Sequence, residues 1–182
     1  IFIVVLCLCA SLDAINWTQP AARQPLKVAA VQANIPEFMK WKRELRGEIY
    51  QRHVDSSEAF LDHDVIVWPE TAIPTFYHIA EKEFISDYAQ QLSQHNAEIV
   101  AGTFTHQPAT EEIYNSMVTI SNPPRFYSKQ HLVPFGVYLP LRGLFAFFDL
   151  LVQIPASNLS PGQGAPLMII GHRPVGVSIC YE

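Results

Sequence analysis

The chain has 182 residues, of which 49% are hydrophobic and 16% are charged. This balance is typical of a folded globular protein and excludes a disordered chain. The formal net charge of -5, without any stripe rich in lysine and arginine, argues against a nucleic-acid partner. Three cysteines, two of them among the first nine residues, are too few for a disulfide framework, so we expect Cys180 to be a free thiol.

The first segment, Ile1 to Leu12, is apolar and uncharged. As a helix it would span roughly 18 Å, which is less than the ~30 Å hydrocarbon core of a membrane. We interpret residues 1–17 as the end of a transmembrane helix whose beginning is missing. The alternative is a signal peptide, but no basic residues precede the apolar run. Residues 18–26 then form a linker that contains proline, and residues 27–182 form an incomplete catalytic domain.

The rest of the chain predicts strands and helices that alternate early and strands that pair late. Buried or alternating apolar runs predict strands over residues 27–33, 65–67, 98–105, 113–121, 125–129, 167–170 and 174–179. Amphipathic spacing predicts helices over residues 40–61 and 81–95. This order indicates an α/β layered domain with a mixed central sheet.

Three chemically capable side chains follow predicted strands: Glu70, Lys129 and Cys180. Functional groups gather at the carboxyl ends of strands in α/β sheets. A thiol with a pKa near 8.5 is only partly ionised at neutral pH, so a base such as Glu70 would activate it and Lys129 would stabilise an oxyanion. The alternatives are a cysteine that packs as a small hydrophobe and a solvated pair of opposite charges.

Segments around these residues resemble the signature segments of the nitrilase superfamily and, within it, the apolipoprotein N-acyltransferase family. They are residues 64–71 (DVIVWPET), 127–136 (YSKQHLVPFG) and 176–182 (GVSICYE). Residues 31–36 (VQANIP) and the Lys40-Trp41 pair are also similar. The resemblance covers residues 27–182. It implies an α-β-β-α sandwich with no metal or organic cofactor, on the periplasmic side of a bacterial inner membrane.

The resemblance also implies roles for particular residues. Glu70 would be the general base, Lys129 the oxyanion stabiliser and Cys180 the nucleophile. Supporting positions match Trp41, Tyr138, Tyr181 and Glu182. Cys180 would accept an acyl chain from a phospholipid as a thioester and pass it to the N-terminal amino group of a diacylglyceryl-modified apolipoprotein. The second interpretation is a soluble nitrilase-type amidase that uses the same triad on a small amide.

One position departs from the family pattern. Val137 stands where the family has a glutamate, which the resemblance implies as a partner of the lysine. Loss of one member of a buried polar network is costly, so a degenerate homologue with only a binding role is a third interpretation. Glu182 is a candidate to compensate for the missing carboxylate.

Two further features leave alternatives open. His131 is a candidate partner of Cys180 in a papain-like cysteine–histidine pair, which would make Glu70 dispensable. Residues 137–151 (VYLPLRGLFAFFDLL) are rich in aromatic and aliphatic side chains. They form either a core loop or an arm that dips into a membrane.

Overall fold

The computed structural model describes residues 2–13, 15–16, 18, 25–133 and 159–182. Its first element is helix α1, Phe2–Asp13. Apolar side chains of α1, such as those of Phe2 and Leu6, are exposed. Among the described helices, none combines the length and the apolar character that crossing a bilayer requires.

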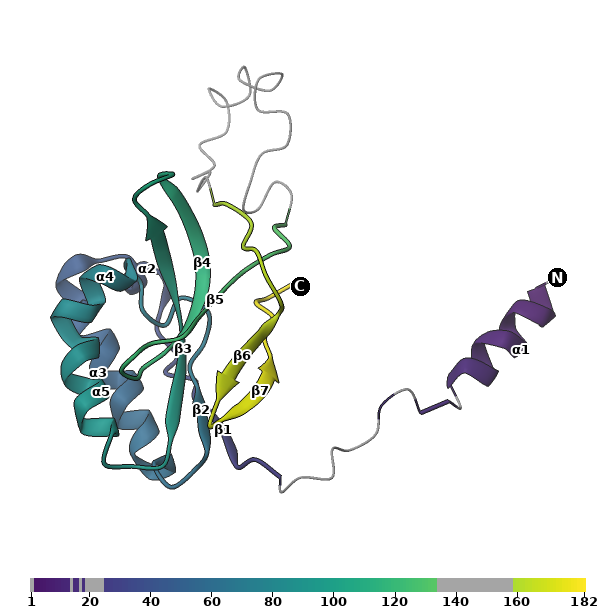
Figure 1. Cartoon of the computed structure of the whole chain (residues 1–182), viewed down its shortest axis with the longest axis horizontal. Helices are drawn as coiled ribbons and strands as arrows, with labels where there is room; N and C mark the ends of the chain where they lie inside the picture. The colour runs from purple at the N-terminus through teal and green to yellow at the C-terminus, as the bar shows by residue number, and fades with distance from the viewer. Residues whose placement is uncertain (1, 14, 17, 19–24, 134–158) are drawn as a thin grey trace, which may run out of the picture.

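A five-stranded mixed sheet forms the centre of the domain (Figure 1). Its strands, in spatial order, are β1 (Val28–Ala30), β2 (Val65–Val67), β3 (Glu98–Gln107), β4 (Glu112–Thr119) and β5 (Phe126–Ser128). The first three run parallel, β4 is antiparallel to β3, and β5 is antiparallel to β4. The predicted mixed sheet is thus confirmed.

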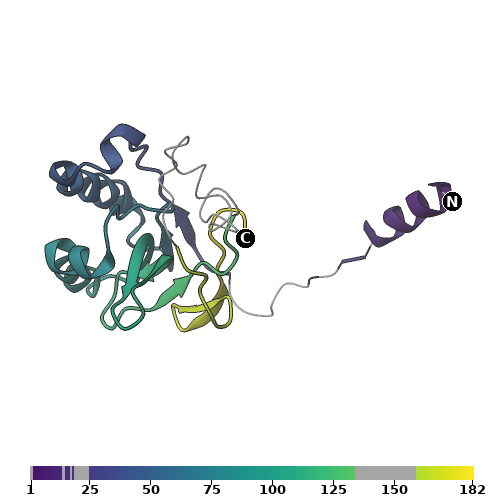
Figure 2. The ribbon, with the colours of Figure 1, turned by 90° about the horizontal axis from the view of Figure 1, so that it is seen from above.

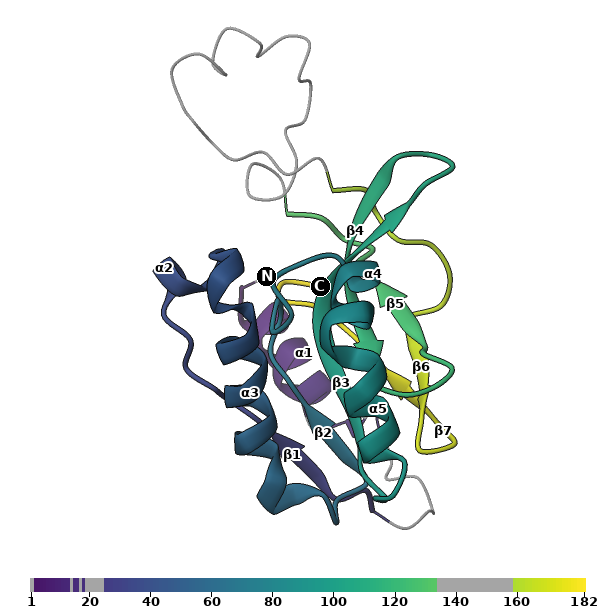
Figure 3. The same ribbon diagram turned by 90° about the vertical axis from the view of Figure 1, so that its left-hand side faces the viewer.

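Helical segments cover one face of this sheet (Figure 3). They are α2 (Glu37–Lys40), η1 (Arg43–Leu45), α3 (Arg46–Ser57), η2 (Glu58–Phe60), α4 (Tyr77–Ala80), the π-helical η3 (Glu81–Ile85) and α5 (Ser86–Leu92). The predicted helix over residues 40–61 is divided, because Lys42 is extended with φ −80° and ψ 118°. Within α3, Ile49, His53 and Ser57 recur every four residues and are buried, as expected of an amphipathic helix.

Two apolar clusters lie on opposite faces of the sheet. One joins the sheet to the helices and includes Ile66, Trp68 and Ile85. The other includes Met117 and Met168 and joins the sheet to a hairpin made of β6 (Leu167–Ile170) and β7 (Arg173–Gly176). Helices, sheet and hairpin stack as three layers (Figure 2). The described residues therefore supply α-β-β of the predicted α-β-β-α sandwich.

The last strand differs from its prediction. The run over residues 174–179 is predicted to be a strand of the central sheet, but β7 ends at Gly176 and pairs only with β6. Val177 donates its N–H to the carbonyl of Pro166 at 3.0 Å, and Pro166 has no N–H to donate back. The ladder ends there, so Cys180 lies beyond the hairpin and not at the tip of a central strand.

Candidate active site

The strand directions bring Glu70 and Lys129 to one edge of the sheet. Because β4 is antiparallel to both of its neighbours, β5 runs in the same direction as β2. Glu70 follows the end of β2, and Lys129 follows the end of β5 directly. Both side chains therefore belong to the edge where parallel strands present their carboxyl ends.

The backbone around Glu70 is pressed against β3. Trp68 donates its backbone N–H to Val100 at 2.8 Å, and Gly102 donates to Pro69 at 3.3 Å. A Cβ on Gly102 would lie 2.7 Å from Cα of Glu70, so only a glycine permits this approach. Glu70 is half-buried, and its Oε1 accepts a hydrogen bond of 2.6 Å from Nδ2 of Asn115.

Lys129 is buried, with 2% of its surface exposed. Its backbone N–H donates to the carbonyl of Asn115 at 2.8 Å, and its own carbonyl accepts from Gly162 at 2.8 Å. Within the described part of the chain, no carboxylate lies within the 4.0 Å ion-pair distance of its ammonium group. The solvated interpretation of Lys129 is therefore wrong, and a lysine this deeply buried is unusual in a folded protein.

Glu182 connects the end of the chain to the segment that carries Lys129. Its side chain is 4% exposed, and its carboxylate accepts from the backbone N–H groups of Gln130 (2.6 Å), His131 (3.1 Å) and Ile179 (2.7 Å). The Tyr127 hydroxyl donates to both oxygens, at 2.9 and 3.0 Å. Burial alone would raise the pKa of Glu182, but these donors outweigh it and lower the pKa.

These contacts correct the hypothesis that Glu182 replaces the missing glutamate as the partner of Lys129. Its oxygens hold backbone N–H groups and a tyrosine hydroxyl, and no ion pair of 4.0 Å or less joins it to Lys129. A carboxylate satisfied in this way fixes loop geometry. We therefore describe Glu182 as a clamp between residues 127–131 and residue 179.

Cys180 lies between Ile179, whose N–H the clamp accepts, and Tyr181, which precedes Glu182. Ile179 is buried, whereas Cys180 is an exposed free thiol. Its φ of 59° lies in the left-handed region, which is uncommon for a residue other than glycine. Such strained residues gather at functional sites. The interpretation of Cys180 as a buried core residue is therefore wrong.

The other predicted site residues occupy more exposed or undescribed positions. Trp41 is 58% exposed, and its Nε1 donates to Glu37 at 3.0 Å. Tyr181 is 83% exposed. The side chain of His131 is 82% exposed, with Nδ1 at 3.9 Å from an oxygen of Glu182. Tyr138 and the rest of residues 137–151, with Val137, lie outside the described residues.

Asn115 and Gly102 both contact the Glu70 segment, and neither residue was identified from the sequence. Both lie inside predicted strands and belong to none of the signature segments. One signal was present, since asparagine and glycine are depleted in strands and either one marks a special position there. No side chain within the signature segments identified which carboxylate or loop they would contact.

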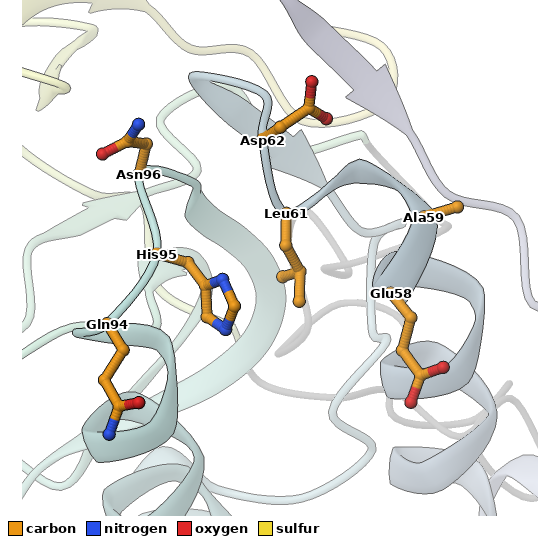
Figure 4. A pocket seen from close by; sticks show the side chains of 7 residues that line it. All are labelled: Glu58, Ala59, Leu61, Asp62, Gln94, His95 and Asn96. Atoms are coloured by element: carbon orange, nitrogen blue, oxygen red, sulfur yellow. The ribbon is translucent and has the colours of Figure 1, made fainter.

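Hollows lie at both edges of the sheet. A pocket of ≈ 220 Å³ at the carboxyl ends of β1 and β2 is lined by Glu70, Lys40 and the buried His53, among others. A wider hollow of ≈ 480 Å³ lies at the opposite edge, where His95 and Asn96 precede β3 (Figure 4). The candidate site belongs to the first edge. Among the described residues, no group of three or more His, Cys, Asp or Glu side chains is placed to hold a metal ion.

An α/β domain with a mixed sheet thus brings a half-buried carboxylate and a buried lysine to one edge, and a clamp ties the loop that carries the thiol to the lysine segment. The chain belongs to the carbon-nitrogen hydrolase family, whose model matches residues 27–182. This match agrees with the resemblance to the nitrilase superfamily.

Curated relatives are named apolipoprotein N-acyltransferase. The protein from Methylococcus capsulatus is 35% identical over 169 residues, which cover 92% of this chain and 33% of that protein. The protein from Pseudomonas paraeruginosa is 36% identical over 180 residues, covering 91% and 33% respectively. The chain therefore spans about a third of the length of these relatives. Among solved structures, Saccharomyces cerevisiae Nit3 aligns with a TM-score of 0.49 and 18% identity, covering 86% of this chain and 55% of that one.

Proposed function

We propose that this chain carries the core of an N-acyltransferase site, in which Cys180 takes an acyl chain from a phospholipid and an apolipoprotein amine receives it. The observation that carries the proposal is the link through Asn115, which joins the carboxylate of Glu70 to the backbone of the buried Lys129. Relatives named apolipoprotein N-acyltransferase support this choice of substrates.

In the first half-reaction, Glu70 accepts the proton of the Cys180 thiol as Sγ attacks the ester carbonyl of the phospholipid. Negative charge develops on the carbonyl oxygen, where the Lys129 ammonium would stabilise it. The carbon–oxygen ester bond then breaks, and the leaving alkoxide takes the proton back from Glu70. The products are an acyl thioester on Cys180 and a lysophospholipid.

In the second half-reaction, the terminal amine of the diacylglyceryl-modified acceptor attacks the thioester. Glu70 accepts a proton from this amine, and Lys129 again faces the oxyanion. The carbon–sulfur bond breaks, an amide forms, and the Cys180 thiolate regains a proton from Glu70. Glu70 returns each proton that it accepts, and no redox step is needed.

The proposal places the reaction at a membrane, on the periplasmic side of a bacterial inner membrane. Residues 1–17 would be the end of a transmembrane helix and residues 18–26 the linker to the catalytic domain. The exposed apolar side chains of α1, including Phe2, Ile3 and Val4, support this placement, because a helix that is apolar on all sides is stable inside a membrane or a core.

Intact-protein mass spectrometry tests the thioester. Incubating the gene product in detergent with phospholipid is expected to add one acyl chain, and treatment with hydroxylamine removes it. Cys180→Ala should abolish the adduct. Cys7→Ala, which removes another exposed thiol, should leave it unchanged. An adduct that persists in Cys180→Ala refutes the mechanism.

The family match also favours a second candidate, hydrolysis of a small amide. Water would then replace the acceptor amine and the same three residues would act. Ammonia release from a small amide, without acyl transfer from phospholipid, would select this function. Formation of a thioester by the wild type would exclude the third interpretation, a homologue that only binds.

A further inference from the structure

Asn115 occupies the position between the two charged residues of the candidate site. It lies on β4, the strand between β3 and β5, and is 6% exposed. Its side-chain amide donates to the carboxylate of Glu70, and its main-chain carbonyl accepts from the backbone N–H of Lys129. We propose that Asn115 is a positioning residue that orients the Glu70 carboxylate and leaves Oε2 as the oxygen that accepts the Cys180 proton. This inference rests on the proposed role of Glu70 as a base.

The direction of the amide follows from the chemistry of its partner. An ionised carboxylate can only accept hydrogen bonds, so the amide group that faces Oε1 of Glu70 at 2.6 Å must be the Nδ2 donor. The observed contact therefore occupies Oε1. Oε2 accepts no hydrogen bond from any described residue.

The main chain of Asn115 fixes the second charged residue. The carbonyl of Asn115 accepts the N–H of Lys129 at 2.8 Å, immediately after the register pair Ser116–Ser128. Side chains alternate along a strand, so Asn115 shares a face with Met117, which packs toward the β6–β7 hairpin. Tyr127, two residues before Lys129, belongs to the same cluster. One residue thus sets the position of both Glu70 and Lys129 on the face that the hairpin covers.

The test uses the reactivity of Cys180 toward iodoacetamide, which requires no lipid substrate. The alkylation rate of Cys180 is measured by peptide mass spectrometry as a function of pH, with the gene product in detergent. In the wild type, an acidic limb should mark the protonation of the base. Glu70→Gln should remove this limb, which tests the proposed function by itself.

The variants at Asn115 then test the inference. Asn115→Asp places a second carboxylate against Glu70, so the acidic limb should move to higher pH by about one unit or more. Asn115→Ala removes the donor without adding charge and should move the limb in the same direction by less, with an alkylation rate roughly 10-fold lower above it. The matched control is Asn96→Asp, at the opposite edge of the sheet, which should leave the limb in place.

The outcomes separate the two hypotheses. If Glu70→Gln leaves the pH profile unchanged, Glu70 is not the base and the proposed function fails. If Glu70→Gln removes the limb but both Asn115 variants retain the wild-type limb, the inference about Asn115 is wrong. An alkylation rate that falls by the same factor at every pH also overturns the inference about Asn115. A purely structural effect would lower the rate in this way without moving the acidic limb. If Asn115→Asp shows no cooperative unfolding transition, and is therefore not folded, the pH profile of Asn115→Ala decides the outcome.

Discussion

Gly102→Ala should displace the loop that carries Glu70. A Cβ at position 102 would meet three backbone atoms: N of Thr71 at 2.6 Å, Cα of Glu70 at 2.7 Å and O of Pro69 at 2.8 Å. None of these belongs to a flexible side chain that could turn away. The loop after β2 must therefore separate from β3.

The size of the effect follows from these distances. Ordinary carbon contacts begin near 3.5 Å, so the loop must move by roughly 0.7–0.9 Å. Misplacing a catalytic group by about 1 Å can cost roughly 100-fold in rate, and overpacking costs about 1–3 kcal/mol of stability. We expect Gly102→Ala to slow acylation of Cys180 by ~30- to 100-fold and to lower the free energy of unfolding by ~1–3 kcal/mol.

The assay is the rate of the acyl adduct by intact-protein mass, paired with urea unfolding. Gly47→Ala is the matched control, because a Cβ at position 47 meets nothing within 4 Å and alanine favours the helix α3. It should keep the wild-type rate and raise stability by about 0.5–1 kcal/mol. A Gly102→Ala protein with wild-type rate and stability would show that the Glu70 loop does not depend on this contact.

Three further predictions concern single side chains. Because its hydrogen bonds hold the pKa of Glu182 below its ordinary value of 4.5, the unfolded state binds more protons there, and the clamp's stabilisation should disappear as pH falls. Urea unfolding should therefore show Glu182→Gln to be less stable by about 1–3 kcal/mol at pH ~7, with a smaller difference near pH ~3; an equal difference contradicts this. Lys129→Met should abolish the adduct, yet leave the free energy of unfolding unchanged or raise it by about 1 kcal/mol, since it removes a buried charge; adduct formation would exclude Lys129 from catalysis. Tyr50→Phe should raise the melting temperature, because the buried Tyr50 hydroxyl has no hydrogen-bond partner among the described residues; a lower melting temperature would contradict this.

The sequence predicted the strands well because their apolar runs are short, buried and bounded by turn residues. The run from Val65 to Val67 is β2, and the run from Leu167 to Ile170 is β6, with the predicted bounds. Burial of His53 and Ser57 followed from their spacing along the helix. These features depend on local periodicity, which a sequence carries directly.

The contacts of the site depended on tertiary structure and were harder to predict. A clamp by Glu182 requires that the end of the chain lie against Gln130, which no local pattern encodes. The end of β7 at Gly176 depends on Pro166, ten residues earlier and directly before β6. The motifs predicted the candidate site residues, whereas the groups that hold them are visible only in the fold.

The bonds that hold the candidate site also set when it can form during folding. The contact between Asn115 and Glu70 spans 45 residues of chain, and the one between Tyr127 and Glu182 spans 55. Closing such long loops costs entropy before any contact compensates for it, so these bonds should form late. If Cys180 has the proposed role, it would meet its base only after the rest of the domain has folded.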